Sequence, residues 1–229
     1  MIRSWPLTLL SLCLLPLLLA LGSWQLQRAD EKQQIIADID ARLAAQPRKL
    51  SALESPEIFT PVRLLGFYTD EYFYLDNRTR NGRVGYEVLQ VFVSGQQRWL
   101  INRGWLAAGS SRNQLPEVNY PLAAKVINGF LYPVPAGKGL ANIGAHARIQ
   151  MIDTGLTAVL GLDEPAWSIR LSADSDTALV TDWEFVNSTP ARHKAYAFQW
   201  FSMAAALCIL WLLAATNIRS MITAGIIRR

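Results

Sequence analysis

Two long apolar segments, one near each end of the chain, constrain the fold more than any other feature of the sequence. Residues Ser4 to Gln27 carry no charged side chain, and from Ala195 to Asn217 the only ionisable groups are Tyr196 and Cys208. A run of about 18 or more mostly apolar residues is long enough to cross a bilayer as a helix. The sequence therefore predicts transmembrane helices at residues 5–27 and 195–217, on either side of a middle segment.

The first apolar segment has two interpretations. A secretory signal peptide has a short basic start and a small-residue cleavage site, for which Arg3 and residues 20–22 are candidates. The uncharged stretch is nevertheless long enough to span a bilayer, and Trp24 follows as an interface anchor. We favour an uncleaved anchor. Its helix is expected to continue to about residue 45, because few helix breakers occur before Pro47.

The distribution of charge predicts the orientation of the chain. The net charge is +4, but every acidic residue lies between Asp30 and Glu184, so the basic surplus lies at the two ends. Basic termini are typical of cytoplasmic ends, which places the middle segment, residues 48–190, outside the cytoplasm and leaves a basic cytoplasmic tail at 218–229. Because the surplus flanks membrane helices, we expect the partner to be the lipid bilayer and no nucleic acid.

The middle segment consists of short β-branched and aromatic runs separated by turn residues. These runs lie at 62–68, 72–75, 85–93, 98–105, 123–132, 167–171 and 183–186, and residues 154–160 favour a short helix. Both cysteines, Cys13 and Cys208, lie in the apolar ends, so the middle segment must be held by its own core. The predicted fold class is membrane-anchored α+β: two transmembrane helices flanking a mostly antiparallel β domain, either a small barrel or a sandwich.

The start of the second apolar segment combines a histidine with aromatic residues. At about 100° per residue, His193, Tyr196 and Trp200 share one face of a helix. Imidazole is a common ligand of metals and of haem iron. The same residues are also typical of the aromatic and basic belt at a membrane interface, so this stretch alone leaves both interpretations open.

Other candidate groups in the middle segment are few. The sequence offers no nucleophile–base–acid set, no Gly-rich phosphate loop and no zinc-ligand spacing, and we interpret His146 as a surface loop residue. Four arginines lie near predicted turns: Arg78, Arg80, Arg83 and Arg103. They are either solvated loop charges or a face that contacts an anion or a partner.

Four short patterns follow one another between residues 22 and 201. They are Gly22-Ser23-Trp24-Gln25-Leu26-Gln27-Arg28; Gly66-Phe67-Tyr68 with Leu75-Asp76-Asn77-Arg78 and Gly82-Arg83-Val84-Gly85-Tyr86-Glu87-Val88; Leu100-Ile101-Asn102-Arg103-Gly104-Trp105; and His193-Lys194-Ala195-Tyr196-Ala197-Phe198-Gln199-Trp200-Phe201. In this order, between two predicted spans, they resemble the surfeit-locus cytochrome c oxidase assembly factors of bacterial and mitochondrial inner membranes.

This resemblance implies a non-enzymatic assembly factor in the bacterial cytoplasmic (inner) membrane, multi-pass, with its β domain in the periplasm. Such a factor binds haem a transiently and assists its insertion into the catalytic subunit of a haem-copper oxidase. The family histidine implicated in haem binding corresponds to His193, which would ligate the iron. We expect Tyr196, Trp200, Trp24 and Arg28 to line a haem slot between the helices, with Arg28 pairing with a propionate.

The second and third patterns also provide candidate partner contacts, at Arg78, Arg103 and Trp105. The partners implied are the oxidase catalytic subunit and haem-synthesis or other assembly proteins. Two alternatives stay open. The protein is a membrane scaffold that stabilises the nascent oxidase subunit without binding haem, or it is an envelope enzyme or transport component whose site is built from the arginine-rich turns.

Overall fold

The computed structural model describes residues 4–50, 53, 55–109, 111, 114–138, 144 and 146–215. Contacts divide the chain into a helical unit, Met1–Asp38 with Glu184–Arg229, and a β-rich unit, Ile39–Trp183. The predicted tail at 218–229 and the end of the predicted span 195–217 lie outside the described residues.

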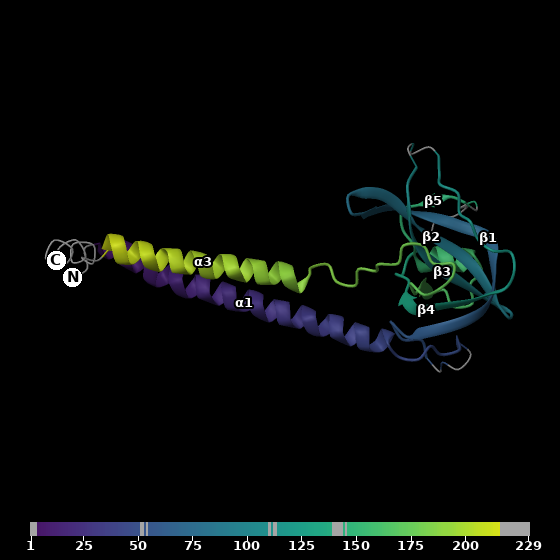
Figure 1. Ribbon diagram of the computed structural model, residues 1–229, viewed down its shortest axis with the longest axis horizontal. Helices are drawn as coiled ribbons and strands as arrows, with labels where there is room; N and C mark the ends of the chain where they lie inside the picture. The colour runs from purple at the N-terminus through teal and green to yellow at the C-terminus, as the bar shows by residue number, and fades with distance from the viewer. Residues whose placement is uncertain are drawn as a thin grey trace. The chain divides into compact units, whose positions relative to one another are not determined.

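The helical unit contains two long apolar helices that lie side by side (Figure 1). α1 spans Trp5–Leu43, with its last turn assigned to the β-rich unit, and α3 spans Pro190–Ala215. Both helices are long and apolar enough to cross a membrane, judged by length and composition. This agrees with the fold class expected from the two uncharged segments.

Polar and small residues join α1 to α3 in an antiparallel pair. Near one end, the indole Nε1 of Trp211 donates a hydrogen bond to Thr8 Oγ1 at 3.1 Å. In the middle, Gly22 lies against the ring of Phe201, leaving no room for a side chain at that position. Small residues at such contacts let two helix backbones approach closely, and polar side chains hydrogen-bond across the contact.

The β-rich unit is a closed barrel with one added strand. Its strands and its helix α2 are β1 Pro61–Arg80, β2 Arg83–Ser94, β3 Gln97–Ala107, β4 Lys125–Pro133, β5 Arg148–Ile149, α2 Thr154–Val159 and β6 Trp167–Leu171. The strand order is β2-β3-β6-β4-β1-β5, and β2 also pairs with β1. This last pairing closes a ring of β1, β2, β3, β6 and β4, so the structure selects the barrel over the sandwich. Pairing is antiparallel except for β3–β6 and β1–β5.

The barrel closes because β1 is long enough to serve two neighbours. Residues 61–66 of β1 pair with β4, and residues 67–80 pair with β2. Gly66 lies where the strand changes partner, and a Cβ there would collide with the backbone carbonyl oxygen of Val93. Glycine is therefore required at this close approach of two backbones. The register then shifts between Tyr68 and Tyr72, so the two predicted runs are one irregular strand.

Two apolar layers hold the strands. The barrel interior is filled from all five ring strands by Val62, Leu64, Tyr68, Phe92, Trp99, Ile101, Ile127, Leu131, Ile169 and Leu171. A second cluster covers the outer side of β1, β2 and β3 with residues from β5 and α2, such as Ile149 and Leu156. Alternate side chains of a strand point to opposite faces, so strands apolar on both faces explain the partial alternation in the sequence.

The strand predicted at 183–186 does not form. In its place, Val180 makes an isolated antiparallel bridge with Trp105, and the indole Nε1 of Trp183 donates to the Leu171 carbonyl at 2.9 Å. The aromatic composition that suggested a strand thus reflects side-chain packing on the barrel rather than a backbone ladder.

Candidate functional site

His193 lies in the first turns of α3 and faces α1. Its Nδ1 lies 2.8 Å from the side-chain oxygen Oε1 of Gln25. Its other ring nitrogen, Nε2, is buried and has no hydrogen-bond partner in the part of the chain that the structure describes. Buried polar atoms almost always have partners, so an unpaired imidazole nitrogen in an apolar helix pair requires a functional explanation.

The contact with Gln25 favours one tautomer of the neutral ring. With the Gln25 amide oxygen as the acceptor, Nδ1 is the donor, and in the neutral ring the lone pair then lies on Nε2. In proteins, a metal-binding histidine usually donates its second ring N–H to such an acceptor, which sets its orientation and basicity. The donor chemistry at His193 therefore fits a ligand of haem iron.

The other residues predicted for the haem slot lie in different environments. Trp24 and Tyr196 are 51% and 47% exposed, whereas Trp200 and Arg28 are partly buried. Arg28 forms an ion pair with Glu31 one turn further along α1. Trp24, Arg28 and Tyr196 thus each keep part of their surface free of contacts within the described chain, and their place in a haem slot stays a prediction.

Within their described residues, α1 and α3 pack closely in the region around His193. Gly22 packs directly on Phe201. Ala29, four residues after Gln25, and Ala197, four residues after His193, are fully buried. A cavity of about 130 Å³ between the helices is lined by residues near Trp211, about 27 Å along α3 from His193 at 1.5 Å per residue. Ligand pockets typically measure roughly 300–1,000 Å³. Small residues thus bring the two backbones together at Gly22, and the haem slot expected between the helices stays a prediction.

Residues of the second and third sequence patterns meet on the barrel. Arg78 Nε lies 3.3 Å from Glu87 Oε1, and Asn102 donates to the other oxygen of Glu87 at 2.6 Å. The indole Nε1 of Trp105 donates to the Arg78 carbonyl at 2.8 Å, and the ring packs on Gly85. Trp105 is buried, whereas Arg78 is partly exposed. Of the predicted partner contacts, Arg78 is thus the one that reaches the surface.

Arg103 points into the barrel. It is 3% exposed, and its guanidinium donates to the carbonyls of Thr177 and Asn119 and to Gln90 Oε1 at 2.9–3.1 Å. It also lies over the Tyr68 ring, 5.0 Å from its centroid. Burial lowers the pKa of Arg103, and Tyr68 acts in the opposite direction. The structure gives this motif residue an internal role, and its predicted partner contact stays a prediction.

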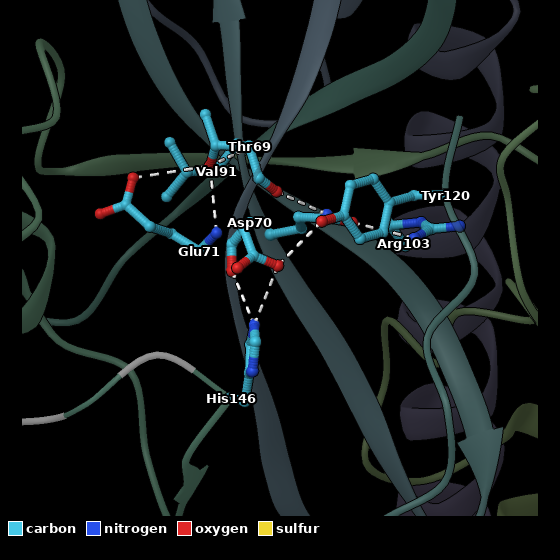
Figure 2. Close-up of polar contacts among 8 residues, drawn as sticks. Thr69, Asp70, Glu71, Val91, Arg103, Tyr120 and His146 are labelled. Atoms are coloured by element: carbon cyan, nitrogen blue, oxygen red, sulfur yellow. Dashed lines mark hydrogen bonds and ion pairs between the residues drawn. The ribbon is translucent and has the colours of Figure 1, made fainter. Parts of the chain in front are cut away.

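His146 is hydrogen-bonded to Asp70 of β1, as Figure 2 shows. Its Nε2 lies 2.8 Å from the Asp70 carbonyl and 3.1 Å from Asp70 Oδ1, and its ring stacks on Tyr72. Tyr120 also donates to Asp70, at 2.9 Å. The hydrogen bond from Tyr120 is the main cause that lowers the pKa of Asp70, and the hydrogen bond with His146 acts in the same direction. The histidine interpreted from the sequence as a surface loop residue anchors the chain before β5.

Gln25 is the residue of this site that sequence reasoning missed. It appears in the first pattern only as part of Trp-Gln, and nothing local links it to a histidine 168 positions away. One signal was available, because an uncharged polar side chain within an apolar helix usually faces a partner rather than lipid.

Comparisons with known proteins agree with the four patterns. The SURF1-like protein of Rickettsia felis is 22% identical over 223 residues, which cover 89% of this chain and 94% of that protein. The SURF1-like protein of Rickettsia bellii is 24% identical over 210 residues, 85% of each chain. The cytochrome oxidase assembly protein SHY1 of Saccharomyces cerevisiae is 30% identical over 105 residues, 41% of this chain and 27% of the yeast protein. The model of the SURF1 family matches residues 12–205, and because this is most of the sequence, the chain belongs to the SURF1 family.

Proposed function

We propose that this protein is an assembly factor for haem-copper (cytochrome c) oxidase. It binds haem a through His193 and assists its insertion into the catalytic subunit. Membership of the SURF1 family and the similarity to the yeast cytochrome oxidase assembly protein support the assembly role. The proposed location is the bacterial inner membrane, with both termini in the cytoplasm and the β-rich unit in the periplasm. The two membrane-competent helices and the basic ends of the sequence support this placement.

The observation that carries the haem proposal is the state of the His193 ring. Nε2 is buried and unpaired among the described residues, and Nδ1 is oriented by Gln25. A haem is the cargo that this nitrogen suits, because neutral imidazole is the usual protein ligand of haem iron. Since the helices are in contact at Gly22 and Phe201, binding requires the side chains that cover Nε2 to move.

The test is an optical titration of the full-length protein with haem a in neutral detergent. We expect saturable binding with the low-spin spectrum of an imidazole ligand. The scaffold alternative predicts instead that the protein crosslinks to the oxidase catalytic subunit while the purified protein takes up no haem. A chain that crosslinks normally and gives no saturable spectrum would therefore overturn the haem proposal and leave the assembly role.

The Arg28→Ala variant tests whether a basic residue of α1 contacts a haem propionate. Its ion pair with Glu31 is partly exposed, so an added carboxylate competes with Glu31 in a solvated setting. Contacts of this kind contribute at most about 1 kcal/mol, and we expect Arg28→Ala to weaken haem a binding roughly two- to fivefold. The loss should vanish when the haem propionates are esterified.

Glu31→Gln is the matched control for Arg28→Ala. It frees Arg28 from its partner and should leave haem affinity unchanged or slightly higher. Equal affinity of Arg28→Ala and wild type in the optical titration would show that the propionate role is wrong.

A further inference from the structure

Arg170, on the outer wall of the barrel, is held by aromatic rings rather than by an ion pair with a described residue. It lies on β6, in register with Asn102 of β3 and Phe130 of β4. Its neighbours Ile169 and Leu171 fill the barrel interior, so the Arg170 side chain points outward. No hydrogen bond or ion pair joins Arg170 to another residue of the described chain, and its contacts are with aromatic rings.

Two rings cover the guanidinium of Arg170. The carbon Cζ lies 3.5 Å from the centroid of the Tyr132 ring and 4.8 Å from that of Trp183. Stacking of this kind holds a planar guanidinium by its faces, while its N–H groups point outward along its edges. The orientation of Arg170 is therefore fixed, and its donors stay available to an acceptor.

The nearby carboxylates are already engaged. Glu87 accepts from Asn102 with one oxygen and pairs with Arg78 through the other. Asp182 pairs with Arg80, which also donates to the Asp182 carbonyl at 2.6 Å. The cluster thus contains three arginines, two acids and one surplus positive charge. Its members are Arg78, Arg80, Arg170, Glu87 and Asp182.

Keeping Arg170 in this place costs free energy. Burial is the main cause that lowers its pKa; Tyr132 and Glu87 act in the opposite direction, and Arg78 and Arg80 add to the lowering. Burial therefore disfavours the charged guanidinium at this position. A ligand that supplies two acceptor oxygens and one negative charge would give Arg170 hydrogen bonds and balance its charge.

We propose that Arg170 is the centre of a carboxylate-binding site, held by Tyr132 and Trp183 and flanked by Arg78 and Arg80. A carboxylate matches the edge of a guanidinium with two parallel hydrogen bonds, and its single charge balances the surplus of the cluster. The carboxylate comes either from an acidic side chain of a partner polypeptide or from a small molecule such as a porphyrin propionate. The site is independent of His193, so its binding should persist in the His193→Ala chain.

The direct test follows the side-chain N–H signals of ¹⁵N-arginine in the full-length protein in neutral detergent. Acetate is added at constant ionic strength, with chloride as the reference salt. We expect one arginine Nε–H signal, absent in Arg170→Lys, to shift saturably with acetate and not with chloride. Arg170→Gln should weaken acetate binding, followed through the Arg78 signal, roughly tenfold or more, the scale expected for a charge-assisted bidentate contact.

Arg63→Gln is the control, because Arg63 lies exposed on the outer side of β1 and should leave acetate binding unchanged. The thermal unfolding temperature of each variant is measured alongside, and Arg170→Lys serves as the charge-retaining variant if Arg170→Gln does not fold. An acetate response that is non-saturable, equal with chloride, or unchanged in Arg170→Gln would overturn the proposal.

Competition distinguishes the two sources of carboxylate. If an iron-free dicarboxylate porphyrin displaces acetate and its dimethyl ester does not, the site takes a small-molecule carboxylate. If a short peptide with blocked ends and a central Glu displaces acetate, and its Gln version does not, the site takes a polypeptide side chain. Displacement by neither compound would overturn the site as proposed.

Discussion

Replacing His193 with alanine is expected to abolish the proposed haem a binding in the optical titration. Nε2 of His193 is buried without a partner among the described residues, and the substitution removes this proposed iron ligand. Loss of an outer residue that merely orients a ligand typically costs 10- to 100-fold in metal affinity, so loss of the ligand itself should exceed about 100-fold. The low-spin imidazole spectrum should disappear at the same time.

Gln25→Leu extends this prediction to the residue that orients the ring. Without the acceptor for Nδ1, the imidazole is free to rotate or change tautomer, and we expect affinity to fall roughly tenfold or more. Gln27→Leu is the matched control, because Gln27 is an exposed residue of the same helix. Equal effects of the two glutamine variants would contradict an orienting role. Unchanged binding by His193→Ala would place the ligand elsewhere.

Arg103→Met is expected to give the largest loss of stability among the arginine variants. The substitution leaves the Thr177 and Asn119 carbonyls and Gln90 Oε1 without their donor inside the barrel. Each buried acceptor left without its donor typically costs about 1–3 kcal/mol, so the total loss of stability should be several kcal/mol. For a chain of this size the midpoint of thermal unfolding should fall by about 10 °C, measured on the full-length protein in detergent.

Arg83→Met is the control for Arg103→Met, because Arg83 lies exposed beside the β1–β2 turn. Its unfolding temperature should stay within about 2 °C of wild type, as expected for a surface substitution. If Arg103→Met unfolds like wild type but fails to support oxidase assembly, the internal role is wrong and the predicted partner contact is favoured.

Local sequence patterns predicted much of the barrel. Asn81 and Gly82 form the two-residue turn between β1 and β2, and both have a positive φ. Gly95, in the turn between β2 and β3, also has a positive φ. These turns depend on which residues tolerate a left-handed backbone, a property of each residue alone. The strand at 167–171 was also predicted with the bounds that the structure has. The prediction of a strand at 183–186 was wrong, because Trp183 contacts the barrel through its side chain, which donates a hydrogen bond to the Leu171 carbonyl.

The sequence by itself determined the two apolar helices, the β-rich middle, the turns and the family patterns, because hydrophobic runs and turn chemistry act over a few residues. Only the tertiary structure decided that β1 closes a barrel, that Arg103 lies inside it, that Arg170 lies over the Tyr132 ring, and that Gln25 contacts His193. Each of these depends on residues far apart in the chain, whose pairing follows from strand register and helix packing. Periodicity carries no information about which distant side chain a polar group will meet.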